Sequence, residues 1–310
     1  MKIRRYCAAH QKEWDDYLHI CKNKHFLFYR GFMDYHHDRF TDHSLIIADD
    51  ENRIVSLFPA NENGGSIYSH QGLTFGGLLY SNRIRTEQVI KIMDEVLAYY
   101  RALGFKSLFY KAIPWIYHLL PAEEDVFALS LQQATRWKIE VSSSLVSREQ
   151  LRYSKGKKWS VNCAKKAGLS IGFCENYKDY WDLLSAVLME KHGAKPVHSL
   201  TEITKLAEMF PTNIKLAVAL HDQVVYAGAV LFLSDKVVHF QYMANSAAGK
   251  ECGALDAVID FVIETYIDER IIDFGISTED DGRVLNKGLI AQKEGFGSGA
   301  VVHRSYRIEI

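Results

Sequence analysis

The chain has no excess of charge of one sign and few residues that break regular structure. Its 37 Lys and Arg nearly balance 38 Asp and Glu, so the formal net charge of the 310 residues is -1. No global field therefore draws the protein onto DNA or an anionic membrane. Only five prolines are present, and 48% of the residues are hydrophobic. This composition is typical of a globular protein with one large domain or two of average size.

Disulfide, secretion and membrane signals are also missing. The five cysteines are odd in number and show no CxxC spacing, which indicates reduced thiols in a cytoplasmic protein. The N-terminus, MKIRRYCAAHQKEWDDY, lacks the apolar segment of a secretory signal. No apolar run approaches the roughly 20 residues of a membrane-spanning helix. The sequence therefore predicts no transmembrane segment.

Histidines and aspartates gather near residue 40, among them His36, His37 and His43. Adjacent histidines point in different directions in either regular structure, and within this segment no His and Glu stand four residues apart. We therefore expect no metal site, and instead a loop that lines a substrate or plain surface.

The stretch from Val237 to Phe274 predicts a strand, a loop with glycines, an amphipathic helix and a second strand. Val237–Met243 is apolar and rich in β-branched residues, and apolar residues recur at helical spacing from Leu255 to Tyr266. A loop that leads into a helix N-terminus presents backbone N–H groups and binds anions in many nucleotide sites. An ordinary β-loop-α-β unit explains the same pattern.

The N-terminal half contains a similar order of elements. Glycines in Ser69–Arg83 indicate a loop or a bulged strand where another group approaches the backbone closely. Thr86–Leu103 predicts a helix with Thr86 as its N-cap. Lys106–Tyr110 and Leu129–Val141 predict strands.

The segment Arg148–Lys166 concentrates basic residues and is expected to be helical in part. A solvated helix face explains such a pattern. Contact with the phosphates of a nucleotide substrate or of RNA is the alternative.

The two halves repeat one pattern at a nearly constant offset. WDDYL at Trp14 matches WDLLS at Trp181, LIIADDENRIVSLFPA matches LAVALHDQVVYAGAVLF, and GFKSLFY matches RIIDFGI. A period this long indicates a duplicated domain. We therefore predict an α/β (α+β) fold of two domains, residues 1–145 and 146–310, each a mixed, largely antiparallel sheet flanked by helices.

A unit of helix, meander, loop, helix and strand resembles the Gcn5-related N-acetyltransferase (GNAT) fold. Two such units resemble the FemABX family of peptidoglycan aminoacyltransferases and its acyl-CoA-type relatives with tandem GNAT domains. The resemblance lies in GLTFGG from Gly72, Arg152 with KKWSVNCAKKAGLSI from Lys157, Tyr242 and Ala244, Gly253, Asp273-Phe274-Gly275, and the closing segment Asn286–Gly297.

The resemblance implies an N-acyltransferase that moves an acyl group from acetyl-CoA or another acyl-CoA to an amine of a sugar-nucleotide or cell-envelope precursor. Residues 146–310 would then form the donor side and residues 1–145 the acceptor side. One alternative is a peptidoglycan peptide aminoacyltransferase that depends on aminoacyl-tRNA. Another is a non-catalytic binding protein that retains the fold. The oligomeric state stays open.

This sequence departs from the family in two places. Ala248–Ala254 does not keep the Gln/Arg-x-x-Gly-x-Gly/Ala phosphate loop of single-domain GNAT enzymes, which favours the binding-protein alternative. No sustained heptad pattern is present, so the long coiled-coil arm of some aminoacyltransferases is not expected.

Acyl transfer to an amine needs a proton acceptor, donors for the oxyanion and an acid for the leaving group. His239 is the candidate base, Tyr242 the candidate acid, Asp273 orients the amine, and Lys293 meets a phosphate or the tetrahedral oxygen. Each has a structural alternative: a core histidine, a core or rim tyrosine, a loop cap and a surface lysine. The predicted donor-binding residues are Met243, Asn245, Gly249, Gly253 and Ala254, and the predicted substrate-binding residues are Gln71, Phe75, Arg152 and Lys158.

Overall fold

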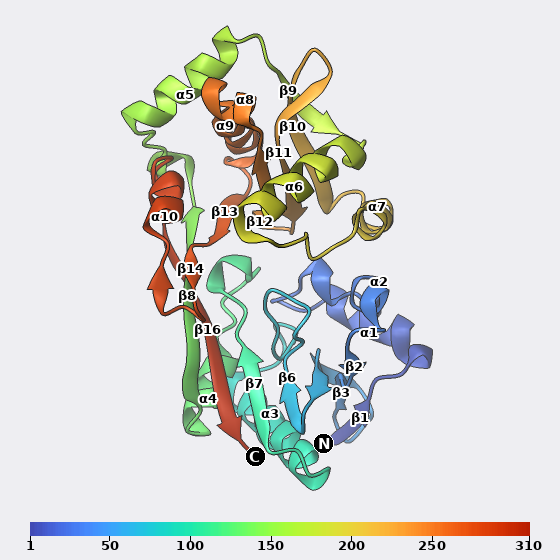
Figure 1. The fold of residues 1–310 in the computed structure, drawn as a ribbon. Coiled ribbons are helices and arrows are strands. Elements are labelled where there is room, and N and C mark those ends of the chain that lie inside the picture. Colours follow the sequence, from blue (N-terminus) through green and yellow to red (C-terminus); the bar gives the residue numbers. More distant parts are fainter. The chain divides into compact units, whose positions relative to one another are not determined.

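The computed structural model describes all 310 residues except the side chain of His192. The chain forms two compact units, which are coloured along the sequence in Figure 1. Unit 1 comprises residues 1–140, 280–283 and 302–310, and unit 2 comprises residues 141–279 and 284–301. The chain enters unit 2 within strand β8 (Thr135–Leu145) and returns to unit 1 within strand β16 (Gly299–Glu309).

Unit 1 is built on two small sheets. An antiparallel sheet has the order β1-β3-β4, with β1 (Lys2–Arg5), β3 (Leu45–Ala48) and β4 (Ile54–Phe58). The other strands have the order β2-β5-β6-β7-β16, with β2 (Thr41–Asp42), β5 (Asn61–Asn63), β6 (Ser66–Tyr68) and β7 (Ser107–Lys111). Strands β6 and β7 are parallel, because helix α3 (Thr86–Ala102) connects them.

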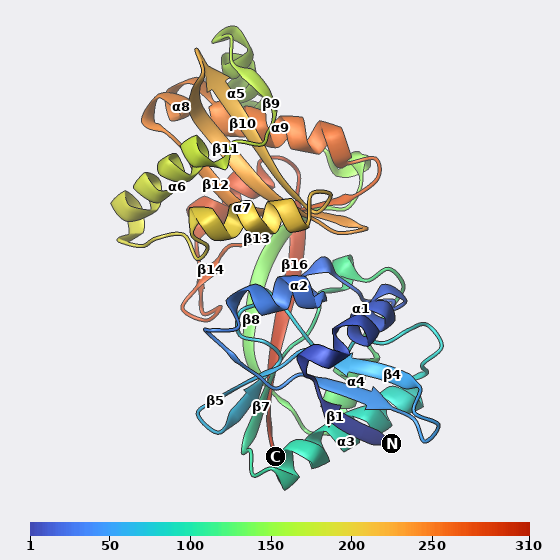
Figure 2. The ribbon, with the colours of Figure 1, turned by 90° about the vertical axis from the view of Figure 1, so that its right-hand side faces the viewer.

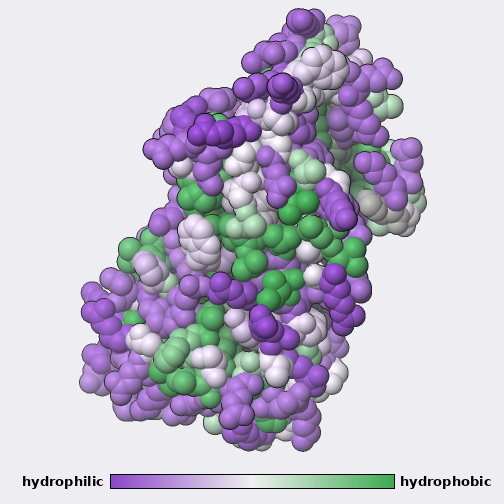
Figure 3. Space-filling view, turned by 90° about the vertical axis from the view of Figure 1, so that its left-hand side faces the viewer, coloured by the Kyte–Doolittle hydropathy of each residue, from purple (hydrophilic) through white to green (hydrophobic). Residues whose placement is uncertain are grey.

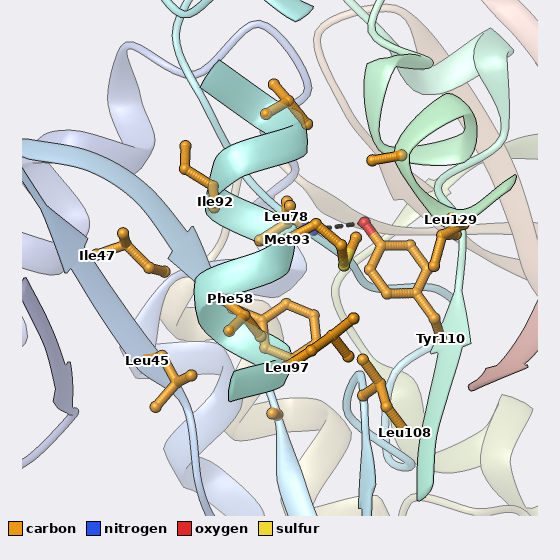
Figure 4. Close-up of a cluster of buried hydrophobic side chains, with 14 of the residues drawn as sticks. Leu45, Ile47, Phe58, Leu78, Ile92, Met93, Leu97, Leu108, Tyr110 and Leu129 are labelled. Carbon is orange, nitrogen blue, oxygen red and sulfur yellow. Dashed lines mark hydrogen bonds between the residues drawn. The ribbon is translucent and has the colours of Figure 1, made fainter. Parts of the chain in front are cut away.

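The helices of unit 1 are otherwise short. They are α1 (Gln11–His19), α2 (Arg30–Met33) and α4 (Glu124–Leu131), with single 3-10 turns at η1 (Ala8–His10), η2 (Phe26–Phe28), η3 (Asp34–His36) and η4 (Trp115–Tyr117). The core of unit 1 lies between α3, α4 and the strands (Figure 4). Met93 and Leu97 of α3 are buried there, and the hydroxyl of Tyr110 accepts a hydrogen bond from the Leu78 amide at 2.7 Å.

Two local predictions for unit 1 are wrong. The N-cap of α3 is Arg85 rather than Thr86, and the side chain of Gln88 accepts a hydrogen bond from its amide at 2.9 Å. The segment Leu129–Val141 is not one strand, because Leu129 belongs to α4 and is fully buried in the unit 1 core. The strand begins only at Thr135.

Unit 2 contains one mixed sheet with the order β8-β13-β12-β11-β10-β9. Its strands are β9 (Ser170–Cys174), β10 (Ile214–His221), β11 (Val224–Leu233), β12 (Val237–Asn245), β13 (Ile271–Ile276) and the second half of β8; β14 (Thr278–Glu279) and β15 (Val284–Leu285) pair separately. Strands β12 and β13 are parallel, and the other neighbours are antiparallel.

Helices cover both faces of the unit 2 sheet (Figures 1 and 2). They are η5 (Arg148–Gln150), α5 (Lys155–Lys166), α6 (Tyr177–His192), α7 (Leu200–Met209), α8 (Ala247–Cys252), α9 (Ala254–Tyr266) and α10 (Lys287–Glu294). Helix α9 packs on the face that carries Leu231, Phe240 and Ile272, and α6 packs on the opposite face. The expected loop before α9 is mostly helical, because Ser246 caps α8 by accepting a hydrogen bond from the Gly249 amide.

The predicted α/β fold with a repeated unit is confirmed. Each unit contains a parallel β-α-β element, β6-α3-β7 in unit 1 and β12-α9-β13 in unit 2. The compact units differ from the halves 1–145 and 146–310 in three segments: residues 141–145 belong to unit 2, and residues 280–283 and 302–310 belong to unit 1. Residues Ser142–Leu145 pair with β13 in unit 2, and Ser305–Glu309 pair with β7 in unit 1.

Hydrophilic residues are interspersed with smaller apolar patches on the face drawn in Figure 3. Among the described residues, no helix combines the length and the apolar character needed to cross a bilayer.

Candidate functional site

Strand β12 carries an irregularity that places two predicted site residues on one face of the sheet. Its pairing with β11 skips Gln241, which makes this position a β-bulge. The β11 partners of His239 and Tyr242 stand two residues apart and so lie on one face. In a regular strand, two residues three positions apart would lie on opposite faces; the bulge brings His239 and Tyr242 to the same face.

His239 and Asp273 form a hydrogen-bonded pair on this face. They are direct partners in the parallel ladder of β12 and β13, and Nδ1 of His239 lies 2.8 Å from Oδ2 of Asp273. An ionised carboxylate only accepts hydrogen bonds, so Nδ1 of His239 is the donor in this contact and Nε2 is the ring nitrogen that Asp273 does not engage. The His239 side chain is 13% exposed, so a small molecule can reach the ring.

Asp273 is fully buried and surrounded by donors. Its Oδ1 accepts hydrogen bonds from the hydroxyls of Ser142 and Ser144 and from the Gly275 amide, the last two at 3.1 and 3.2 Å. Together with His239, these donors replace the water that an ionised carboxylate loses on burial. Asp273 thus contacts His239 and also caps the turn that follows it through the Gly275 amide. Its role in orienting the amine stays a prediction.

Lys293 of α10 is buried beside this pair, so the surface-lysine interpretation is wrong. Its Nζ donates hydrogen bonds to the carbonyl oxygens of Gly275 and Ile276, both at 2.7 Å. Burial lowers the pKa of Lys293 to about 8, although the charge of Asp273 acts in the opposite direction. The ammonium has three N–H groups, so one remains for a further negative oxygen.

Tyr242 lies on the face of the unit 2 sheet that α6 covers. Its hydroxyl lies 2.6 Å from Nδ1 of His198, and its ring meets the ring of Trp181 edge-on at 5.4 Å. Burial raises the pKa of Tyr242 to about 12. The phenol therefore keeps its proton at neutral pH.

Strands β12 and β13 part beyond the His239–Asp273 pair. Their ladder covers only Val237–His239, although β12 continues to Asn245. The Ser246 amide donates a hydrogen bond to the carbonyl oxygen of Tyr226 in β11. Because amides alternate along a strand, the N–H groups of Met243 and Asn245 point to the other edge, where β13 has departed. Both residues belong to the predicted donor-binding set.

The other predicted donor-binding residues have packing reasons for their identities. Gly253 has φ +77°, and a Cβ there would lie 2.3 Å from the carbonyl oxygen of Ser160 in α5. A Cβ at Gly249 would lie 2.4 Å from the carbonyl oxygen of Tyr226. Ala254 is fully buried in the unit 2 core. A donor role for these residues stays a prediction.

The basic segment is partly neutralised by α9. Lys157 forms an ion pair with Asp256 at 2.6 Å, and Arg148 pairs with Asp268 at 2.7 Å and with Glu264. These contacts attach α5 and η5 to α9. The two predicted substrate-binding residues of this segment, Arg152 and Lys158, are both exposed.

The predicted substrate-binding residues of unit 1 lie together in a pocket of about 240 Å³. Gln71 lines it and accepts a hydrogen bond from Asn61 at 2.8 Å. Phe75 is buried at its base, where its ring lies 4.6 Å from that of Tyr117.

The histidine-rich segment of unit 1 is held by local contacts. Nδ1 of His36 lies 2.7 Å from the Met33 carbonyl oxygen, and Nδ1 of His43 lies 2.7 Å from a carboxylate oxygen of Glu62. The described part of the chain contains no group of three or more His, Cys, Asp or Glu placed to hold a metal ion.

The sequence did not identify three partners of the site. Ser142 and Ser144 reach Asp273 from β8, and His198 reaches Tyr242 from the turn before α7. The run Ser142-Ser143-Ser144 inside an apolar strand is the one signal that was present, because buried hydroxyls need partners. His198 has no such signal.

Comparisons with known proteins agree on the fold. No family model matches the chain, and no curated protein sequence matches it significantly. Among solved structures, FemX is similar over 100% of this chain and 98% of its own, with 10% identity and a TM-score of 0.70. L-PGS from Bacillus licheniformis is similar over 86% of this chain and 83% of its own (11% identity, TM-score 0.58). A tandem GNAT protein from the clavulanic acid biosynthesis pathway is similar over 99% and 98% (11% identity, TM-score 0.54).

Identities this low establish the fold alone. The predicted likeness to FemABX and tandem GNAT proteins is thereby confirmed at the level of architecture: the chain shares its fold with FemX and with a tandem GNAT protein.

Proposed function

We propose that this protein is an N-acyltransferase whose reaction takes place at the His239–Asp273 pair of unit 2. The single observation that carries the proposal is the hydrogen bond between His239 and the fully buried Asp273, at the point where β12 and β13 separate. A binding protein that had lost catalysis would have no use for an imidazole oriented by a carboxylate with no exposed surface. The pair therefore favours an enzyme over the non-catalytic alternative.

Different residues of the site carry out the separate steps of the acyl transfer. Nε2 of His239 takes a proton from the attacking amine, while Asp273 holds Nδ1–H and stabilises the imidazolium that forms. The new N–C bond places negative charge on the acyl oxygen. The N–H groups of Met243 and Asn245 and the third N–H of Lys293 supply donors for that oxygen. When the C–S or C–O bond to the leaving group breaks, Tyr242 gives the leaving group a proton.

The acyl donor of the first proposal is an acyl-CoA, and the acceptor is an amine of a sugar-nucleotide or cell-envelope precursor. Support for a thioester donor comes from the edge of β12 that β13 leaves unpaired beyond His239. An extended acyl chain fits along this edge. The pyrophosphate of CoA fits less well, because Ser160 of α5 already packs against Gly253 at the N-terminus of α9.

The contact between Ser160 and Gly253 specifically favours a second candidate, an aminoacyl-tRNA-dependent transferase. The acyl ester at the end of a tRNA needs no pyrophosphate site beside α9. Exposed lysines of α5 such as Lys155, Lys158 and Lys166 provide cations for RNA phosphates.

One experiment separates the two donors. The full-length protein is incubated with radiolabelled acetyl-CoA or with a mixture of charged tRNAs, and with a panel of amines that includes amino sugars, UDP-amino sugars and a lysine-containing peptide. Transfer of label to an amine that is lost in Asp273→Asn and kept in Asp222→Asn supports the proposal. Asp222 is an exposed carboxylate of unit 2 and serves as the matched control.

Binding is followed in parallel by thermal unfolding, since a ligand stabilises in proportion to the logarithm of its excess over Kd. Stabilisation by acetyl-CoA supports the first donor, and stabilisation by charged tRNA that is lost at high salt supports the second. Absence of transfer and of stabilisation with either donor would contradict the proposed function.

A further inference from the structure

A pocket of about 240 Å³ lies wholly within unit 1 and shares no residue with the His239 site. Its walls come from β6, β7, the unit 1 ends of β8 and β16, and the loop that follows Tyr68. Most ligand pockets measure roughly 300–1,000 Å³. This pocket therefore suits a molecule much smaller than a nucleotide.

Lys111, the last residue of β7, presents an amine to this pocket. Its Nζ donates a hydrogen bond to the carbonyl oxygen of Leu73, and its backbone amide donates to the hydroxyl of Ser69 at 2.7 Å. A carbonyl oxygen accepts the hydrogen bond but does not balance the charge of an ammonium. Burial, reinforced by repulsion from Lys138, lowers the pKa of Lys111 to about 7.

The charged groups that face Lys111 are cations, or carboxylates that already form an ion pair with another cation. From β8 come Lys138 and Glu140, which pair with each other at 2.9 Å, and Lys138 also lies 3.4 Å from Asp281. From β16 come His303 and Arg304, and Arg304 pairs with Glu123 at 3.1 Å. Burial lowers the pKa of His70 in the loop, and the nearby charge of Lys111 lowers it further. An anion in the pocket would complete the charge balance, and a cation would worsen it.

Aromatic residues form part of the remaining wall. Tyr68 lines the pocket and stacks on Phe109, with ring centroids 4.6 Å apart and planes 8° apart. Trp137 meets the same Phe109 ring edge-on and is 43% exposed at the pocket. Phe75 closes the base. Flat apolar walls of this kind favour a planar body over a bare inorganic ion.

We propose that this unit 1 pocket binds a small organic carboxylate with a planar apolar body, and that Lys111 is the counter-ion of the carboxylate. The proposal does not depend on acyl transfer in unit 2, because binding requires neither donor nor acceptor. It gives a role to Gln71 and Phe75, which the sequence predicts as substrate-binding residues.

The first test is calorimetric titration of the full-length protein with benzoate, benzamide, benzylamine and inorganic phosphate. We expect benzoate to bind at least about tenfold more tightly than benzamide, because a charge-assisted hydrogen bond is worth about 1.4 kcal/mol or more. Benzylamine and phosphate should bind more weakly still. Affinity for benzoate should fall as the pH rises above about 7, because the carboxylate binds the protonated form of Lys111.

Two lysine variants locate the charge. Lys111→Gln should lose at least about tenfold in benzoate affinity while its weak binding of benzamide stays the same. Lys106→Gln is the matched control, since Lys106 is exposed near the start of the same strand, and its affinity should match that of the wild type.

A measurement on the wild-type protein guards against a variant that fails to fold. Limited acetylation with acetic anhydride at pH 7, read by mass spectrometry, should modify Lys111 more slowly when benzoate is present, and Lys106 at an unchanged rate. Equal affinity for benzoate and benzamide, no binding of any probe, or no protection of Lys111 would each overturn the proposal.

Discussion

Nδ1 of His239 lies 2.8 Å from Oδ2 of Asp273, and this carboxylate has no exposed surface. The pair marks the last rung of the ladder between β12 and β13. Three further donors on the other oxygen of Asp273 fix the orientation of its carboxylate, and the contact with Oδ2 orients the imidazole of His239. This relationship makes the roles of the two residues separable by experiment.

We expect His239→Asn and Asp273→Asn each to lower the rate of acyl transfer by about 10²–10⁴-fold. The first change removes the base, and the second removes the acceptor that holds the productive tautomer. Donor affinity should change less than about threefold, because neither group is needed for binding. Single-turnover rates and thermal shift measure the two effects.

His221→Asn is the control for this pair, because His221 is a half-exposed histidine at the end of β10. It should transfer acyl groups at the wild-type rate. A His239→Asn protein with more than half of the wild-type rate would contradict the assignment of the base.

The buried Lys293 should give the protein a pH-dependent stability. Its pKa is about 8 in the folded state, against 10.5 for an ordinary lysine, so between these values the unfolded state binds more protons. The free energy of unfolding therefore gains a contribution that rises with pH from about 8 to 10.5, by up to about 3 kcal/mol.

Lys293→Met lacks this contribution. The difference in unfolding free energy between wild type and variant, measured in urea at pH 7.5, 9 and 10.5, should move in favour of the wild type as the pH rises. Parallel curves for the two proteins would show that Lys293 titrates normally. Lys287→Met, with the first residue of α10 changed, is the control.

Tyr242→Phe tests proton donation to the leaving group. Because burial raises its pKa to about 12, Tyr242 is a protonated phenol at neutral pH. We expect transfer from a thioester to slow by about 10²-fold, while transfer from p-nitrophenyl acetate changes little, since p-nitrophenolate leaves without a proton. Equal losses with both donors would indicate a packing role, through the contact with His198.

Gly253→Ala should destabilise the protein more than Gly168→Ala. Both glycines have positive φ, 77° and 70°, so each substitution costs about 1 kcal/mol of backbone strain. Only at Gly253 does the new Cβ meet backbone, the Ser160 carbonyl of α5. The added displacement of α5 should cost about 1–3 kcal/mol more. Equal midpoints of urea unfolding would contradict this packing.

The sequence predicted elements well where one strong periodicity ran over a long segment. The apolar stripe of α9 is such a local pattern, and it is present in the structure. The segment around Leu129 was misread because a short buried helix followed by a strand resembles one apolar run. Helix α8 was missed because its residues are small and polar.

Candidate residues were found more readily than their partners. His239, Asp273 and Lys293 were all identified from the chain, but their proximity depends on the register of β12 against β13 and on the position of α10. The ion pairs of Lys157 with Asp256 and of Arg148 with Asp268 could not be predicted from local patterns either, because the partners lie 99 and 120 residues apart in the sequence.

The sequence by itself determined the class of fold and its repetition, because helix and strand periods are local properties of the chain and recur in both halves. Only the tertiary structure decided the local geometry within the repeated units. The bulge at Gln241, the departure of β13 from β12 and the packing of Ser160 against Gly253 each arise from contacts between distant segments. Such contacts depend on the packing of whole elements, and no short pattern of residues encodes them.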